Sequence, residues 1–278
     1  MLSNVNASTQ NPIKTISNIN KILQDEYGFI WVAGQQGLTR VDGNSNINFS
    51  LNNSDWPLAF NWVHDVAKID NKLLLATEIN GLWLFNPDNG QAEKIPVNTP
   101  SQSYYGVVAF QGYYYINVSS QLTTKKNLYR FKPQTNTTQL LYNDIKIDDL
   151  VHSKDNLFVS SADGLFKLVD EKLIPIIEQP ITAVTALNDS VIAITANKLV
   201  KLTDDGNSQS IRHNEKIYGL TKEYSSNNFF TVNAQGVVTK YDGANLATLP
   251  NSYDKSETVY ITDAYHDASG VLWLSSST

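Results

Sequence analysis

Short runs of apolar and β-branched residues recur along the whole chain, separated by turns rich in Gly, Asp and Asn. The run from Asn20 to Gln24 is followed by an Asp-Glu-Tyr-Gly turn, and the run from Phe29 to Gly34 by a turn that ends at Gly37. Two further runs, Leu38 to Val41 and Ile47 to Leu51, flank an Asp-Gly-Asn segment, which is a strong hairpin signal. This first unit therefore predicts four short antiparallel strands.

The same order of strands and turns continues through six copies, and the first half of a seventh copy follows. The copies begin at the first-strand anchor residues Ile19, Val63, Tyr104, Ile147, Ile181, Ile217 and Ile261. A period of about 40 residues matches the ~40–50-residue blades of β-propellers. No stretch carries apolar residues at helical spacing over three turns, so almost no helix is expected. The pattern predicts an all-β fold, a β-propeller of about seven four-stranded blades, six complete in the sequence plus a partial seventh.

The predicted domain division is simple. Residues 1–18 form an N-terminal segment, and residues 19–278 form the propeller. An incomplete last blade would expose unpaired N–H and C=O groups, so a short strand from Ile13 to Ile16 is a candidate to close it. The alternative, which we favour, is that the natural chain continues past Thr278 and supplies the outer strands itself.

Composition narrows the function classes. The 278 residues include 21 basic and 27 acidic side chains, a net charge of −6, which disfavours nucleic acid as a partner. The chain has no cysteine, which excludes disulfides, zinc–thiolate sites and thiol nucleophiles. No apolar run approaches the ~18 residues of a membrane span. The first twelve residues lack a signal-peptide pattern, so any export signal has been removed or lies outside this sequence.

The segment from Gln24 to Gly43, QDEYGFIWVAGQQGLTRVDG, resembles the two-component regulator propeller repeat. That repeat has the pattern D-x-x-G-x-[IL]-W-[IV]-G-T-x-x-G-L-x-R-[YF]-D-G, and the chain departs from it at Ala33-Gly34, where Gly-Thr is usual. A shorter match runs from Asp267 to Leu274, and a partial one begins at Gly81. The other copies match in period only. Residues that fit the first match are Asp25, Gly28, Ile30, Trp31, Val32, Gly37, Leu38, Arg40, Asp42 and Gly43.

The resemblance implies a location and a role. Proteins with this repeat are typically periplasmic sensing regions of inner-membrane hybrid histidine kinases or diguanylate cyclases. Their propellers precede an immunoglobulin-like sandwich, a transmembrane helix and a cytoplasmic output domain. The chain is therefore expected to be a periplasmic ectodomain that reaches the membrane only through segments absent here. The resemblance supplies neither a ligand nor a catalytic residue.

No constellation of side chains predicts catalysis. Asp25 and Asp267 precede Gly28 and Gly270 by the same spacing, which is typical of turn capping rather than of acid–base chemistry. The chain has only three arginines, too few for the central cluster of a sialidase. Its four histidines show no metal spacing, and it has no phosphate loop. We therefore expect a non-catalytic domain without metal or cofactor.

A candidate ligand site emerges from comparing the copies. First strands line the central channel of a propeller, so the residue after each anchor would join a ring near one mouth. Such a ring would suit a hydroxyl-rich ligand, although polar residues that solvate a water-filled channel explain the pattern as well. The long link after the first copy adds two tryptophans, which either lie on the same face or pack as blade spacers. The candidates are Asn20, His64, Tyr105, Asp148, Thr182, Tyr218 and Thr262, together with Trp56 and Trp62.

The leading hypothesis is thus a ligand-sensing propeller that signals by binding an unknown small molecule, for example an oligosaccharide, or a partner domain. The second is a structural module whose faces bind another protein, a second propeller or a second copy of the chain. The third and weakest is a glycan-acting enzyme, which would depend on His64, Tyr105, Asp148 or Tyr218.

Overall fold

The computed structural model describes residues 18–42, 45–119, 125–243, 246–249 and 260–277. In it the first repeat folds as four antiparallel strands in the order β1-β2-β3-β4. The strand bounds lie within two residues of those that the apolar runs predict. They are β1 (Ile19–Gln24), β2 (Ile30–Gly34), β3 (Gly37–Asp42) and β4 (Ser45–Phe49).

Five more sheets repeat this arrangement, each with four antiparallel strands. The second and third are β5 (Val63–Ile69), β6 (Lys72–Thr77), β7 (Gly81–Asn86), β8 (Gln91–Ile95), and β9 (Tyr104–Phe110), β10 (Tyr113–Ser119), β11 (Lys126–Lys132), β12 (Thr137–Ile145). The fourth and fifth are β13 (Asp149–His152), β14 (Leu157–Ser161), β15 (Gly164–Val169), β16 (Lys172–Ile177), and β17 (Ala183–Ala186), β18 (Ser190–Ile194), β19 (Lys198–Thr203), β20 (Ser208–Arg212). The sixth is β21 (Ile217–Lys222), β22 (Phe229–Asn233), β23 (Val238–Tyr241), β24 (Leu246–Thr248).

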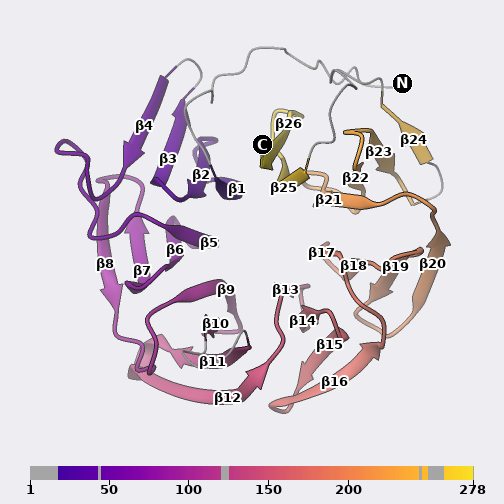
Figure 1. Ribbon diagram of the computed structural model, residues 1–278, viewed down its shortest axis with the longest axis horizontal. Helices are drawn as coiled ribbons and strands as arrows, with labels where there is room; N and C mark the ends of the chain where they lie inside the picture. The colour runs from indigo at the N-terminus through magenta and orange to yellow at the C-terminus, as the bar shows by residue number, and fades with distance from the viewer. Residues whose placement is uncertain (1–17, 43–44, 120–124, 244–245, 250–259, 278) are drawn as a thin grey trace.

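The sheets stand around a central axis as the blades of a propeller (Figure 1). The first strand of each sheet lies nearest the axis, and the fourth strand lies on the perimeter. The last two strands, β25 (Tyr260–His266) and β26 (Leu272–Ser277), form a separate two-stranded sheet between β21 and β1. Among the described residues, the only helix is a single 3₁₀ turn, η1 (Pro133–Thr135). The all-β propeller and its six four-stranded blades are thereby confirmed, whereas the strand expected near Ile13 lies outside the described residues.

The hydrophobic core lies between adjacent blades. Between the first two blades, the buried Trp31 ring packs on Phe49 and Phe85, with ring centroids 5.6 and 5.3 Å apart. Further clusters fill the gaps between the following blades in the same way. Because each blade buries both faces against its neighbours, its second strand is apolar on both sides, as the wholly buried β2 and β18 show.

The capping role predicted for Asp25 is confirmed. Its Oδ1 accepts hydrogen bonds from the backbone N–H of Tyr27 and Phe29 at 3.0 and 2.9 Å, and Gly28 has a φ of 92°. Its Oδ2 also accepts a bond from the indole Nε1 of Trp31 at 2.7 Å, which the sequence did not reveal. Asp267 makes the same bonds in its own turn, including one from Trp273 Nε1 at 2.7 Å.

Candidate functional site

A β-bulge at the start of several inner strands determines how side chains enter the channel. In β1 the register with β2 shifts between Ile19 and Lys21, so Asn20 is the extra residue. The same shift places His64, Tyr105, Tyr218 and Thr262 at bulges in β5, β9, β21 and β25. A bulge turns its side chain away from the regular alternation of the strand. In these five sheets, the candidate position after the anchor is therefore the bulge residue.

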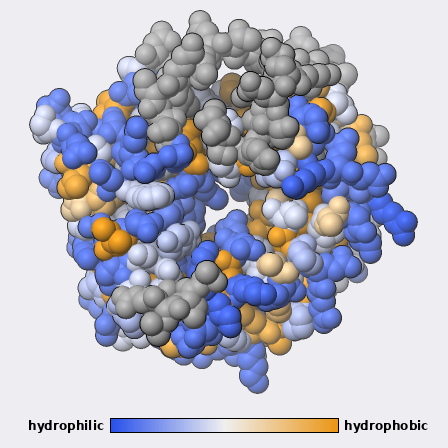
Figure 2. All heavy atoms as spheres, in the orientation of Figure 1, coloured by the Kyte–Doolittle hydropathy of each residue, from blue (hydrophilic) through white to orange (hydrophobic). Residues whose placement is uncertain are grey.

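A polar cavity of about 290 Å³ opens at the mouth of the channel. Figure 2 shows a hollow at the centre of this face, with hydrophilic residues and some apolar residues around it. Six of the seven ring candidates line this cavity, from six different sheets: Asn20, His64, Tyr105, Asp148, Thr182 and Thr262. Tyr218 is not among the lining residues, and its ring lies 5.0 Å from the Nζ of Lys216.

One wall of the cavity is aromatic. The imidazole of His64 lies between the rings of Trp62 and Tyr105, with centroid distances of 5.5 and 4.3 Å. His64 Nε2 donates to the carboxylate of Glu78, which also accepts a bond from the Tyr105 hydroxyl at 3.4 Å. Trp62 is not among the residues that line the cavity, and it keeps 40% of its surface exposed. This wall can therefore stack on a ring and hydrogen-bond to it at once.

The second tryptophan candidate lies elsewhere. The ring of Trp56 packs on Phe49 at 5.3 Å, and a Cβ on Gly90 would lie 2.8 Å from it. Trp56 therefore covers the outer part of the first two blades, and the structure does not bring it to Trp62 and the cavity. Of the two tryptophans in the link after β4, Trp56 thus packs on the outer part of the blades and Trp62 stacks on the cavity residue His64.

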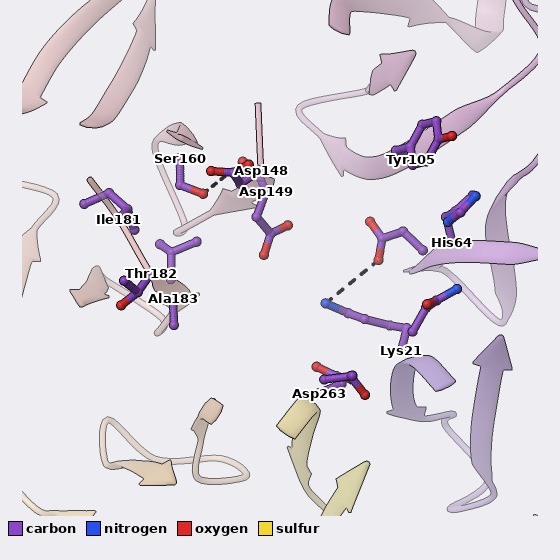
Figure 3. A pocket seen from close by; sticks show the side chains of 14 residues that line it. Lys21, His64, Tyr105, Asp148, Asp149, Ser160, Ile181, Thr182, Ala183 and Asp263 are labelled. Atoms are coloured by element: carbon purple, nitrogen blue, oxygen red, sulfur yellow. Dashed lines mark hydrogen bonds and ion pairs between the residues drawn. The ribbon is translucent and has the colours of Figure 1, made fainter. Parts of the chain in front are cut away.

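Four charged residues of the cavity were not among the sequence candidates. Lys21, Asp65, Asp149 and Asp263 all lie two residues after their first-strand anchors, one position beyond the predicted ring. Figure 3 shows Lys21, Asp149 and Asp263 facing the cavity from three different strands. The sequence itself contains a signal for these residues, because Asp recurs at this position in three copies. The predicted ring used only the preceding position of each copy.

Two of these carboxylates join neighbouring sheets. Asp65 Oδ2 accepts a hydrogen bond from the backbone N–H of Val107 in β9 at 2.9 Å, and Asp263 Oδ2 accepts one from Ile22 in β1 at 2.6 Å. Asp149 differs, since its Oδ1 accepts a bond from Leu150 in its own strand at 2.8 Å. Asp65 and Asp263 are therefore committed to the fold, whereas Asp149 is not.

Lys21 is the positive centre of this group. Its Nζ lies 3.8 Å from Asp65 Oδ1, and its side chain is 35% exposed to the channel. Burial alone would lower the pKa of Lys21, but the carboxylates of Asp263, Asp65 and Asp149 together raise it above its usual value. Lys21 therefore stays protonated at all physiological pH values.

The carboxylates are shifted in the protonated direction. Burial raises the pKa of Asp65 to about 6 and that of Asp263 to about 6, although Lys21 opposes both shifts. Burial also raises the pKa of Asp149. Within the described residues, no cluster of His, Asp and Glu has the geometry of a metal site. The arrangement can bind polar and charged groups, but it shows no nucleophile paired with a base.

No protein-family model matches the chain, and no curated protein matches its sequence. Among the described residues, no helix has the length and apolar character that a membrane crossing requires.

Solved structures do resemble the chain. The extracellular domain of BT4673 from B. thetaiotaomicron, described as a hybrid two-component system, is 18% identical with a TM-score of 0.70, over 94% of this chain and 37% of its own. That of BT3049 from the same organism is 13% identical, also with a TM-score of 0.70, over 94% and 39%. The Pan2 WD40 domain of Neurospora crassa is 9% identical with a TM-score of 0.68, over 94% and 86%. The chain thus spans little more than a third of the two-component domains that it resembles. At these identities, the comparison shows a shared fold. The chain has the same β-propeller fold as these extracellular domains.

Proposed function

We propose that the chain is the ligand-sensing propeller of a membrane-bound signalling protein, exposed in the periplasm and without catalytic activity of its own. The likeness to extracellular domains of two-component systems supports the setting. One observation carries the ligand-binding role: a polar cavity of about 290 Å³ with an aromatic wall made by His64 and Tyr105, and with Trp62 stacked on His64. Cavities of this size with convergent polar groups are typical of small-molecule sites.

The two-stranded sheet is the part of the domain through which ligand binding would be transmitted. We infer that β25 and β26 are the inner half of a seventh blade, because they occupy the place of a blade between β21 and β1. Its outer half would come from chain outside the described residues. A ligand at the channel touches β25 through Thr262 and Asp263, so binding would act on the least complete part of the ring.

Calorimetric titration of the protein with a panel of neutral mono- and oligosaccharides tests the ligand-binding role. Replacing Trp62 or Tyr105 with Ala should weaken any binding by at least about tenfold, since a sugar ring gains several contacts when it stacks on an aromatic side chain. Trp56→Ala is the matched control, because that ring packs outside the cavity. Binding that all three variants retain would contradict this site.

A second function is favoured by a specific surface feature. The perimeter strands expose Leu140, Ile174, Ile176 and Ile211, on β12, β16 and β20. Exposed apolar side chains on outer strands suit contact with another propeller or a second copy of the chain. Sedimentation analysis over a wide concentration range tests this alternative, and a monomer throughout would count against self-association.

A further inference from the structure

The charges around the cavity are not balanced. Lys21 faces three carboxylates, those of Asp263, Asp65 and Asp149, and two of them, Asp65 and Asp263, also accept bonds from backbone N–H groups of the next sheet. The fourth sheet adds Asp148, which is exposed at the mouth, and Asp149. In the part of the chain that the structure describes, neither the Asp148 carboxylate nor Asp149 Oδ2 has a hydrogen-bond partner. The wall formed by β13 is therefore the negative side of the cavity.

One cation reaches this wall without neutralising it. The Nζ of Lys126 donates to the backbone carbonyl of Ile147 at 2.9 Å and lies 5.1 Å from the centre of the Tyr105 ring. Burial lowers the pKa of Lys126, while Asp148 and Asp149 oppose that shift. Its ammonium is thus directed to a carbonyl and an aromatic face, and forms no ion pair with either carboxylate.

A buried amide stands beside the same wall. Asn117 in β10 is fully buried, and neither its Nδ2 nor its Oδ1 has a partner among the described residues. It pairs with Gly106, which occupies the ring position of Lys21 and Asp65 but has no side chain. A Cβ on Gly106 would lie 3.6 Å from Asn117 Nδ2 and 3.8 Å from Asp65 Oδ2. The missing side chain therefore leaves the amide facing the ring of charges.

The direction of this amide follows from the alternation of the strands. Val108 and Tyr115 lie two residues further along the same face, and they pack against Ile147 and Leu150 of the fourth sheet. Asn117 consequently points into the gap between the third and fourth sheets, where it is fully buried and does not itself line the cavity. An unsatisfied buried amide costs stability unless something pairs with it.

We propose that the cavity binds the protonated amine of a small hydroxyl-rich ligand, with the ammonium held by Asp148 and Asp149 on the β13 side, next to the gap that contains Asn117. An ammonium brings several N–H donors and no acceptor, which suits carboxylates that have free acceptor oxygens. The inference rests on the proposed ligand-sensing function and adds the charge of the ligand. An organic cation fits better than a metal ion, since the described carboxylates do not converge as a metal site.

Three hexoses that differ in charge provide the test: glucosamine, glucose and glucuronate. Titrated at about pH 6.5, where a sugar amine is largely protonated, glucosamine should bind at least about tenfold more tightly than glucose, and glucuronate more weakly than both. N-acetylglucosamine, which keeps the nitrogen but loses the charge, should bind no better than glucose.

Asp149→Asn should remove the preference for glucosamine while leaving the affinity for glucose within about twofold. Asp155→Asn is the matched control, because it removes one charge from an exposed turn of the same sheet. Asn117→Leu gives a second readout. It should raise the Tm by about 2–4 °C, because an unpaired amide leaves the core, and should weaken glucosamine binding. A merely structural Asn117 would change the Tm without changing the binding.

The outcomes separate this inference from the function on which it rests. Equal affinity for glucose and glucosamine, lost in Trp62→Ala, would overturn the proposed charge and keep the ligand site. A preference for glucosamine that survives Asp149→Asn would overturn the proposed place of the ammonium. Failure of all four sugars, and of the neutral oligosaccharide panel, to bind would overturn both proposals.

Discussion

At the scale of single residues, the same amino acid has different tasks in different copies of the repeat. Asp25 and Asp267 hold turns and an indole, Asp65 and Asp263 tie one sheet to the next, and Asp149 keeps an oxygen free. The difference follows from which backbone N–H groups each carboxylate can reach. Substitutions at these residues should therefore have graded effects.

Asp25→Ala should lower the free energy of unfolding by about 2–4 kcal/mol, because it leaves a buried indole N–H and two turn amides without their acceptor. Asp25→Asn should cost less, since an amide oxygen can still accept the turn bonds. Urea denaturation measures both values, and Asp42→Ala, an exposed carboxylate in the same sheet, is the control. Equal losses in the two Asp25 variants would contradict the role of the turn bonds.

Lys21→Met should destabilise the protein more at high pH than at low pH. The raised pKa values of Asp65 and Asp263, about 6 each, mean that the folded state favours their protonated forms. Their contribution to stability therefore falls as the pH rises from about 4 to about 6, and Lys21 offsets this loss. Without Lys21 the carboxylates repel each other whenever they are ionised.

Because the Lys21 side chain is 35% exposed, channel water screens it. We expect a loss of about 1–3 kcal/mol at about pH 8 and under about 1 kcal/mol at about pH 5. Urea denaturation at the two pH values measures the difference. Lys154→Met, at an exposed position, should show no such dependence. A pH-independent loss in Lys21→Met would rule out the electrostatic explanation.

At the scale of elements, tight turns and bulges decide where side chains go. The turn before β15 needs Gly164, whose φ is 146°, and a Cβ there would lie 2.0 Å from the carbonyl oxygen of Ile177. Gly206, in the turn between β19 and β20, has a φ of 91° but no atom within 4 Å of a Cβ. The two glycines thus separate backbone strain from steric conflict.

Gly206→Ala should lower the free energy of unfolding by about 1–2 kcal/mol, because an alanine must adopt a positive φ there without meeting any neighbouring atom. Gly164→Ala should cost more, about 3 kcal/mol or above, because β15 and β16 must also move apart. Thermal denaturation of the two variants compares these costs. Similar Tm values would show that the sheet absorbs the extra methyl group without strain.

At the scale of the whole molecule, the seam between the two-stranded sheet and the first blade brings together the two ends of the described chain. Side chains of β25 bridge it: Asp263 accepts from Ile22 N, and the Thr262 hydroxyl donates to the Ile19 carbonyl at 2.9 Å. A third bond joins Ala268 N to Gln24 Oε1 at 2.8 Å. These three contacts join residues more than 240 positions apart in the chain.

Asp263→Ala should loosen this seam locally before it unfolds the protein. The amide of Ile22 should exchange with deuterium at least about tenfold faster, because its acceptor is lost and local opening becomes easier. The amide of Val107, bonded to Asp65 in the equivalent place, should keep its rate and serves as the internal control. Faster exchange at both amides would indicate global destabilisation instead.

The sequence alone determined the repeat, the strands and the blade architecture, because apolar alternation and turn residues act over a few positions and recur seven times. It also identified six of the cavity residues, since equivalent positions in a repeat share a place on the axis. It did not reveal the charged ring one position further on, nor Asn117.

Only the tertiary structure decided which Asp bonds to the next sheet, which keeps an oxygen free and which tryptophan stacks on a cavity residue. The physical reason is that each depends on the neighbouring blade. Whether a carboxylate meets a backbone N–H of the next sheet, as Asp65 meets Val107, or bonds only within its own strand, as Asp149 does, is set by the packing of one sheet on the next. The period of a repeat does not determine that packing.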